Sequence, residues 1–403
     1  MTTTERPVLP FPRANVLEIA PLYRVLRRQG PLARVTSPAG DPAWLVTRHA
    51  EAKRIFGDKR FGRSHPDPAN APRVSDAAVL SAPEGDFETE QAQHAFLRAL
   101  LMPAFSAGRM RKLSGRVREL TEQCLDAMRA EADRNPGMPV DLHEHLSFPL
   151  PVLVICELLG VPYEDRHHFR DLSERIGMIH GGEDTMAAMA DFVGYLASLA
   201  ERKRREPGED VVSDMVRAQA QTPGFGDQQL AEVAVALLFA GHETTVNRID
   251  VGVLLLLADP DRRDAFAADP EGQAKGTVEE VLRIATPEAL GTLRYAREDV
   301  DLDGVLVGKG DAVIISLAAA NRDEDVFADP DAFDPHRSPN PHLAFGHGGF
   351  FCLGATLARV EMQVALSCLF TRFPRLRLAV PVDGLRLQHE RLLGGVDEVP
   401  VLW

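Results

Sequence analysis

The amino-acid sequence predicts a mainly α protein with a minor β-sheet region. Apolar residues recur with helical spacing along most of the 403 residues, and segments with strand-like alternation are few. One candidate helix, 228–258, would be roughly 45 Å long at about 1.5 Å per residue, and it is apolar on most of its faces. No linker rich in Gly, Ser or Pro divides the chain, and no internal repeat is found. We therefore expect one large domain over residues 1–403.

The helical pattern is bounded by ordinary start and stop signals. The 228–258 helix, for example, has Asp227 as a plausible N-cap and ends at the Asp259-Pro260 step. The predicted helices are, in chain order, Pro21–Gln29, His49–Phe56, His94–Met102, Arg109–Ala130, Pro151–Leu159, Arg166–Ile179, Thr185–Arg205, Gln228–Ala258, Pro260–Ala268, Gly276–Ile284 and Leu353–Thr371. The predicted strands are Leu32–Thr36, Ala43–Val46, Asp299–Leu302, Ala312–Ser316 and parts of the C-terminal tail.

The stretch Gly62–Gln93 is rich in Pro, Ala, Ser and acidic residues and lacks periodicity. A loop of this length in a compact domain usually serves as a lid or a binding loop, so we expect a functional loop here.

Composition excludes several classes of protein. A net charge of −14 argues against general affinity for nucleic acid or for an anionic membrane. The four cysteines are scattered without zinc-like spacing, which disfavours a disulfide framework. The N-terminus lacks a signal pattern, and the apolar runs Val233–Ala240 and Val251–Ala258 are shorter than the ~20 residues that cross a bilayer. We expect a soluble, cytoplasmic protein.

The stretch Phe345–Gly354 (FGHGGFFCLG) carries the clearest chemical signal. Its glycines allow a tight turn and a close approach to a flat or bulky group, and Cys352 stands where the helix Leu353–Thr371 is predicted to begin. A helix N-terminus stabilises a thiolate, which is the form of cysteine that binds a metal. A buried structural cysteine is the commoner role, but the glycines favour a thiolate that ligates haem iron.

A second signal lies in the middle of the long helix, at Ala240-Gly241-His242-Glu243-Thr244-Thr245. An acid and two hydroxyls between apolar runs cost free energy unless they are hydrogen-bonded. One interpretation is a kinked helix with locally satisfied polar groups; the other is a proton-delivery site facing a ligand. A zinc-protease motif is excluded, because Val246 stands where H-E-x-x-H requires its second histidine.

Two sets of charged residues accompany these motifs. Glu280 and Arg283 are one helical turn apart, and Arg337 would complete a triad that braces the region behind the cysteine. His94 and Arg98 share a helix face, and with Arg294 they are candidates to bind an anion such as a haem propionate. Taken singly, each of these residues is also typical of an ordinary solvated surface.

These motifs occur together and in order with Asn321-Arg322-Asp323, Phe327 and Phe333-Asp334, and in this the chain resembles a bacterial soluble cytochrome P450. The similarity extends over essentially the whole chain, including Pro151–Pro162. The resemblance implies the P450 fold and haem b with Cys352 as its axial thiolate. It implies Glu243 and Thr244 as the catalytic acid–alcohol pair, and Glu280, Arg283 and Arg337 as a structural triad. The cofactor contacts that it implies are His94, Arg98, Arg294, Phe345, Gly346, Phe350 and Ala240.

The activity implied is that of a haem-thiolate monooxygenase, an oxidoreductase that activates O₂ with two electrons from a ferredoxin and its ferredoxin reductase. It would hydroxylate or epoxidise an apolar small molecule in antibiotic or other secondary metabolism, acting as a monomer. The expected substrate contacts are the Gly62–Gln93 loop, Leu237, Ala240, Ala289, Leu290 and the tail at Leu392–Leu393. Two alternatives are a peroxide-driven P450 and a non-catalytic P450-like helper. The retained acid–alcohol pair favours the ferredoxin route over the first, and the retained cysteine and Glu–Arg pair argue against the second.

Three positions depart from the family pattern. Phe350 stands where His or Arg usually donates to a haem propionate, so one charge-assisted bond to haem is missing unless His347 or another group replaces it. Glu90-Gln91-Ala92-Gln93 replaces an acidic-Pro-Pro-Glu segment, and Thr356 replaces a common proline after the cysteine. None of these changes removes a catalytic group.

Overall fold

The structure is a computed structural model that describes residues 6–75, 82–176, 182–222, 224–285, 291–388 and 395–403. The chain groups into two compact units, each assembled from segments that are distant in sequence. Unit 1 comprises Met1–His94, Gly276–Cys352 and Leu387–Gly395, and unit 2 comprises Ala95–Lys275, Leu353–Arg386 and Val396–Trp403. The expectation of one domain over residues 1–403 stays a prediction.

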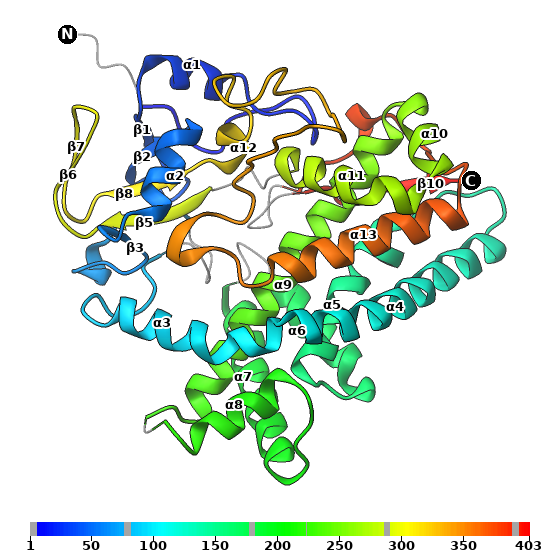
Figure 1. The fold of residues 1–403 in the computed structure, drawn as a ribbon, viewed down its shortest axis with the longest axis horizontal. Helices are drawn as coiled ribbons and strands as arrows, with labels where there is room; N and C mark the ends of the chain where they lie inside the picture. The colour runs from blue at the N-terminus through cyan, green and yellow to red at the C-terminus, as the bar shows by residue number, and fades with distance from the viewer. Residues whose placement is uncertain (1–5, 76–81, 177–181, 223, 286–290, 389–394) are drawn as a thin grey trace. The chain divides into compact units, whose positions relative to one another are not determined.

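Unit 1 contains a five-stranded sheet in the order β1-β2-β8-β5-β3 (Figure 1). β2 and β8 pair in parallel, and the other neighbours pair antiparallel. The strands are β1 (Ala33–Thr36), β2 (Pro42–Val46), β3 (Phe61–Gly62), β5 (Thr292–Ala296) and β8 (Ala312–Ile315). The helices of this part of the chain are α1 (Leu22–Gln29), α2 (His49–Gly57) and α12 (Leu317–Ala320), with the short 3₁₀ turns Pro68–Asn70 and Gly348–Phe350.

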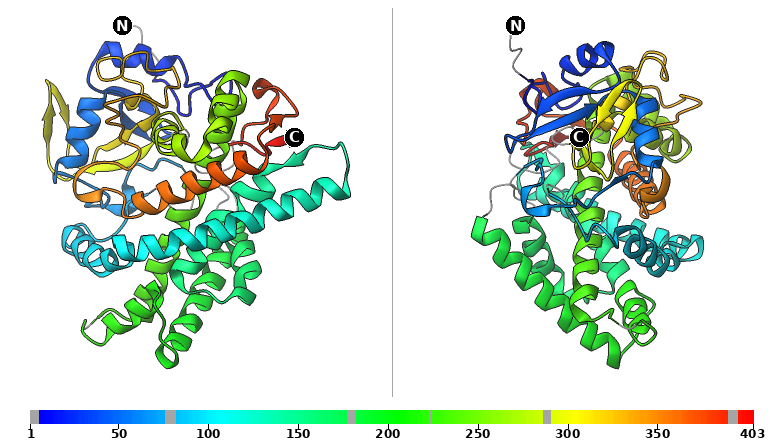
Figure 2. Two further views of the ribbon diagram at one scale, coloured as in Figure 1. Left: turned by 45° about the vertical axis from the view of Figure 1, so that its right-hand side comes forward. Right: turned by 90° about the vertical axis from the view of Figure 1, so that its left-hand side faces the viewer.

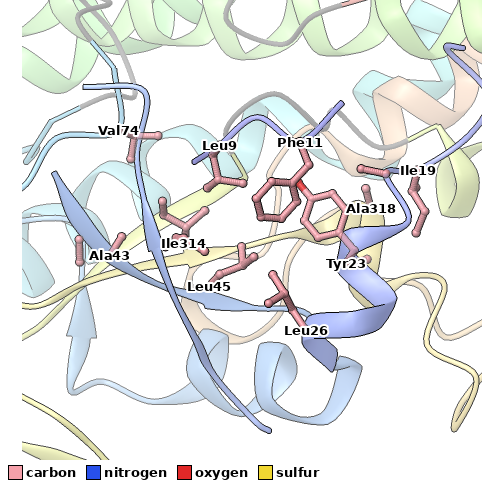
Figure 3. Packing of buried hydrophobic residues seen from close by; sticks show 14 of the residues in the cluster. Leu9, Phe11, Ile19, Tyr23, Leu26, Ala43, Leu45, Val74, Ile314 and Ala318 are labelled. Atoms are coloured by element: carbon pink, nitrogen blue, oxygen red, sulfur yellow. The ribbon is translucent and has the colours of Figure 1, made fainter. Parts of the chain in front are cut away.

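Both faces of this sheet are covered, which explains why its central strands are apolar throughout. Leu45 and Ile314 belong to a core cluster on one face with Tyr23 of α1, while Val46 and Ile315 belong to a cluster on the other face. Figure 3 shows the first cluster, in which the ring centroids of Phe11 and Tyr23 are 4.9 Å apart.

A separate hairpin joins β6 (Val300–Leu302) to β7 (Val305–Val307) through Asp303 and Gly304. Both turn residues have positive φ, 53° and 86°, as a type I′ turn requires, and Asp-Gly is a preferred pair for that turn. The predicted strand Asp299–Leu302 corresponds to β6, whereas its partner β7 was not predicted, although the Asp-Gly pair signals a hairpin.

Unit 2 is helical, with a small sheet in the order β4-β10-β9. The central helix α9 (Asp227–Leu257) packs against α5, α7 and α13, and both figures show α13 alongside α4 (Figures 1 and 2). The other elements of the unit are α4 (Ala107–Arg134), α5 (Pro149–Leu159), α6 (Arg166–Ile176), α7 (Gly182–Arg205), α8 (Val211–Gln219), α10 (Pro260–Ala268), α13 (Ala355–Arg372), β4 (Val140–Asp141), β9 (Arg377–Leu378), β10 (Pro400–Leu402), the π-helical turn His143–Ser147 and the 3₁₀ turns Met102–Phe105, Tyr163–Asp165 and Val382–Gly384.

Two helices, α3 (Glu90–Leu101) and α11 (Pro270–Ile284), continue from one unit into the other. The predicted start of α3 at His94 is wrong by four residues. The Asp86 carboxylate accepts the Thr89 N–H at 2.9 Å and the Asp86 carbonyl accepts the Glu90 N–H at 2.9 Å, so helical bonding begins earlier. The predicted Gly62–Gln93 loop is correspondingly shorter, and its residues 76–81 lie outside the described residues.

Other helix ends also differ from the prediction. The N-cap of α9 is Gly226, whose N–H donates to the Gln229 side chain at 3.0 Å, while Asp227 pairs with Arg204. The helix α8 was not predicted, although Asp210 caps it by accepting the Ser213 N–H at 2.8 Å. Within the described ranges, no helix is both long enough and apolar enough to cross a membrane.

Candidate functional site

The cysteine loop of unit 1 is fixed by its backbone. Gly346 and Gly348 both have φ of 70°, and the Cys352 N–H donates to the Phe345 carbonyl at 2.9 Å. A Cβ at Gly348 would lie 2.7 Å from the Phe56 carbonyl oxygen, so only glycine fits where the loop meets the end of α2. Phe345 is buried and Cys352 is exposed. The loop therefore holds an exposed thiol in a defined place.

The relation of Cys352 to the following helix differs from the prediction. The helix α13 begins at Ala355 and its N-cap is Gly354, because Leu353 and Gly354 form a turn. Cys352 thus lies two residues before the cap. The predicted start at Leu353 is wrong, and the contribution of the helix dipole at the sulfur is smaller than a cysteine in the first turn would receive.

Two arginines and a histidine of unit 1 lie around Phe350. The Phe350 ring centroid lies 4.2 Å from that of His94, 4.9 Å from the guanidinium carbon of Arg294 and 5.0 Å from that of Arg63. Arg294 is buried, and burial, followed by the nearby charge of Arg63, lowers its pKa to about 10. Arg98 is half-buried and follows His94 by one turn of α3. The structure therefore brings His94 and Arg294 together, and adds Arg63, which the sequence analysis missed.

The predicted triad is also brought together. Arg283 donates two parallel bonds to the Glu280 carboxylate, at 2.8 and 2.7 Å, and both side chains are fully buried. The Arg337 Nε donates to the same carboxylate at 3.2 Å. The Asp334 N–H and the Asn340 side-chain amide add bonds at 3.0 and 3.1 Å. Every donor around Glu280 comes from unit 1, and all of them bind the same carboxylate.

The remaining three N–H groups of Arg283 bind backbone carbonyls outside this cluster. Arg283 donates to the backbone carbonyls of Asn321, Pro330 and Ala332 at 3.0, 2.6 and 2.9 Å. One buried guanidinium therefore ties the end of α11 to the 321–332 segment, well before the cysteine loop in the chain.

The acid–alcohol pair lies on α9 in unit 2, in a helix that continues without interruption. Glu243 is buried, Thr244 is half-buried, and the Thr244 hydroxyl donates to the Ala240 carbonyl at 2.9 Å. Asn247 and Arg248 likewise donate to the carbonyls of Glu243 and Thr244, at 3.3 and 3.0 Å. These bonds give the side-chain donors of Thr244, Asn247 and Arg248 local partners within the helix.

Two features set the surroundings of this pair. A Cβ at Gly241 would lie 3.2 Å from Ile155, so the glycine allows α5 to pack closely against α9. The neighbouring His242 is buried with its ring edge-on to Phe148, at 4.6 Å between centroids. His242 is thus placed in the core, and in the parts of the chain that are described no cluster of three metal-binding side chains occurs.

The expected substrate contacts are only partly described. Leu237 is half-buried and Ala240 is exposed, both on α9. Ala289, Leu290, Leu392 and Leu393 lie outside the described residues.

Comparison with known proteins gives one consistent family. The cytochrome P450 family model matches residues 274–380. Pentalenolactone synthase of Streptomyces exfoliatus is 40% identical over 98% of this chain and 99% of its own length. Nocardicin C N-oxygenase of Nocardia uniformis subsp. tsuyamanensis is 41% identical over the full length of both proteins.

Solved structures agree with this result. The polyene macrolide epoxidase PimD, a cytochrome P450, superposes with a TM-score of 0.87 at 40% identity, covering 99% of each chain. The mixed-function P450 MycG superposes with a TM-score of 0.88 at 38% identity, covering 99% of this chain and all of its own. The mainly α fold with small sheets is therefore confirmed as the P450 fold, and the chain belongs to the cytochrome P450 family of monooxygenases.

Proposed function

We propose that this P450 holds haem b through the thiolate of Cys352 and oxidises an apolar small molecule in natural-product biosynthesis. The family implies a haem-thiolate cofactor. The observation that carries the residue assignment is the cysteine loop, in which glycines at positive φ and the Cys352–Phe345 backbone bond present an exposed thiol. Haem held in this way would receive electron density from the thiolate sulfur, which favours O–O bond cleavage.

The charged groups of unit 1 fit such a cofactor. Haem carries two propionates, and the same unit that holds Cys352 also holds the buried cation Arg294. Among the described residues, Arg294 forms no ion pair, and its one hydrogen bond is to the carbonyl of Leu293 at 2.7 Å. A buried guanidinium of this kind requires an anionic partner. His94, Arg98 and Arg294 are proposed as the propionate partners, with Phe345, Gly346, Phe350 and Ala240 as further cofactor contacts.

Glu243 and Thr244 are proposed to deliver protons during oxygen activation. The Thr244 hydroxyl donates to the Ala240 carbonyl, which leaves its oxygen lone pairs available to accept a bond from a water molecule. The adjacent Glu243 carboxyl supplies the exchangeable proton. Leu237 and Ala240 on the same helix are proposed substrate contacts, together with Ala289, Leu290 and Leu393.

The names of the relatives support the proposed substrate class. They act on natural products: one is an N-oxygenase of nocardicin C, and another a hydroxylase and epoxidase of mycinamicin IV. We propose a chemically related role here, with a ferredoxin and ferredoxin reductase as electron donors and the protein acting as a monomer.

Replacement of Cys352 by Ser tests the ligand. The reduced, carbon-monoxide-bound protein is expected to lose the Soret band of thiolate haem. Cys368→Ser is the matched control, because Cys368 is a buried cysteine of α13 whose sulfur accepts a bond from Arg118 at 3.5 Å. Persistence of the band in Cys352→Ser would show that the ligand assignment is wrong.

Turnover separates the possible routes. Product formation with ferredoxin, reductase and NAD(P)H, at a rate well above that with hydrogen peroxide, supports the ferredoxin route. Equal rates would favour a peroxide-driven enzyme, and purified protein that takes up no haem would favour a non-catalytic helper.

A further inference from the structure

Phe350, which carries no charge, lies beside two arginines and a histidine. Arg63, His94 and Arg294 approach its ring from three separate elements: the segment after β3, the helix α3 and the strand β5. A ring face attracts a cation by about 0.5–2 kcal/mol, which offsets only part of the repulsion between neighbouring cations. The arrangement therefore favours an anion in contact with the group.

The carboxylates of the surroundings do not balance this group. Glu84 pairs with Arg63 at 2.9 Å, in a contact that is more than a third exposed on both sides. Glu90 is buried, but it is already bonded to Arg297, to Ser64 and to the backbone of Arg63. Arg294, as described above, has no carboxylate partner among the described residues. Arg294 is therefore the arginine of this group whose charge no carboxylate of the described residues balances.

The position of Arg63 is set by Glu90. The Glu90 carboxylate accepts the backbone N–H of Arg63 at 2.7 Å and that of Ser64 at 3.2 Å. A Cβ on Gly62 would overlap this carboxylate, so a larger residue would have to displace Glu90 from its present position. Because Glu90 is the first residue of α3, the same helix that carries His94 also fixes the backbone of Arg63.

The guanidinium of Arg63 has N–H groups that its pair with Glu84 does not use. One terminal nitrogen donates to Glu84, whereas Nε is buried and has no hydrogen-bond partner. An orphaned buried N–H calls for a partner that the protein itself does not supply. His347, the other candidate to replace the missing donor, lies against α2, where its ring is 3.8 Å from the position of a Cβ on Gly57.

We propose that Arg63 binds a haem propionate and supplies the cation that Phe350 cannot, with Glu84 as a competing counter-ion that limits the strength of this bond. This inference rests on the proposed function, since it requires haem to be the cofactor. Arg63 is a half-exposed arginine, and its bond to a carboxylate is of the charge-assisted kind.

The test is the rate at which the holoenzyme loses haem to an excess of apomyoglobin. Arg63→Ala is expected to release haem about fivefold faster, the size expected for losing one half-exposed charge-assisted bond, and to shift the haem reduction potential to more negative values. Arg63→Lys is expected to restore most of both properties because it keeps the charge. If Arg63→Ala does not yield folded protein, Arg63→Gln gives the same comparison.

Two further variants identify the mechanism. Glu84→Gln is expected to slow haem release about twofold, and to have no effect when Arg63 is already alanine. Arg60→Ala is the matched control, because Arg60 lies three residues earlier and pairs with Asp58 at 2.6 Å, so its haem release is expected to match the wild type.

The outcomes separate this inference from the proposed function. If Arg63→Ala keeps the thiolate Soret band and releases haem at the wild-type rate, Arg63 serves only as the partner of Glu84 and the inference is wrong. If the wild type itself lacks that band, the proposed function fails first.

Discussion

Two charged clusters of unit 1 are built in opposite ways. Around Glu280, a carboxylate stands at the centre and every neighbour donates to it, and Glu280 and Arg283 are inaccessible to solvent. Around Phe350, an aromatic ring stands at the centre and the neighbours are Arg63, Arg294 and the ring of His94. The first cluster is complete within the protein, which suits a structural brace. In the second, Glu84 pairs with Arg63, but among the described residues no carboxylate pairs with Arg294, which suits a place where a ligand supplies an anion.

The largest expected effect tests the claim that the Glu280 cluster is complete. Glu280→Gln removes the charge that compensates Arg283 and is expected to lower the free energy of unfolding by about 3–5 kcal/mol, the cost of breaking a buried pair. Urea denaturation followed by circular dichroism measures it.

Arg294→Gln provides the contrasting control. It removes a buried cation that has no carboxylate partner, so the haem-free protein is expected to be at least as stable as the wild type, while haem release becomes faster. A loss of stability equal to that of Glu280→Gln would show that Arg294, like Arg283, has its charge balanced within the protein.

A pH series addresses the Glu90 anchor. Burial raises the pKa of Glu90, but bonds from the Ser64 hydroxyl, from the backbone of Arg63 and Ser64, and from Arg297 outweigh it, so the pKa is lowered from its ordinary value. A lowered carboxyl pKa stabilises the folded state above the unfolded-state pKa, and this stabilisation is lost as the pH falls through the folded-state pKa. At pH 7 the free energy of unfolding, measured by thermal denaturation, is therefore expected to be about 2 kcal/mol higher for the wild type than for Glu90→Gln.

The same series contains its own check. The difference between wild type and Glu90→Gln should shrink steadily below about pH 4.5, the ordinary region of a glutamate. A difference that stays constant down to pH 3 would mean that the charge of Glu90 does not contribute.

The smallest expected effect comes from changing the centre of the second cluster. Phe350→His introduces a donor where the ring now stands, and is expected to slow haem release about threefold at pH 6, where more of the imidazole is protonated. Combined with Arg63→Ala, it should reduce the effect of that change, because both supply the same bond. Full additivity in the double variant would contradict a shared role. Phe350→Leu controls for loss of the ring.

Much of the architecture could be predicted because it depends on local pattern. The α9 helix and the strands β2 and β8 have long apolar runs, and the structure places them within a residue or two of the prediction. The strand β5 was not predicted, because Arg294 interrupts its apolar pattern. This arginine is nevertheless buried, by residues that are distant in sequence. The triad could be anticipated from the Glu280–Arg283 spacing, since one helical turn brings the two side chains together.

The cation group around Phe350 could be predicted only in part. His94 and Arg294 have a counterpart in the family pattern, but Arg63 follows Gly62 in a segment without periodicity, and nothing local marks it. Its role depends on Glu90, which is 27 residues away in sequence. Contacts of that range are set by the tertiary fold, and a single sequence does not display them.

The contact of Gly348 with the Phe56 carbonyl has a consequence for engineering this enzyme. The last turn of α2 packs directly against the cysteine loop, although almost 300 residues separate them in sequence. Variant libraries aimed at the haem environment would ordinarily vary the loop alone. Positions 56, 57 and 348 are in close backbone contact. They are best varied together or left as they are.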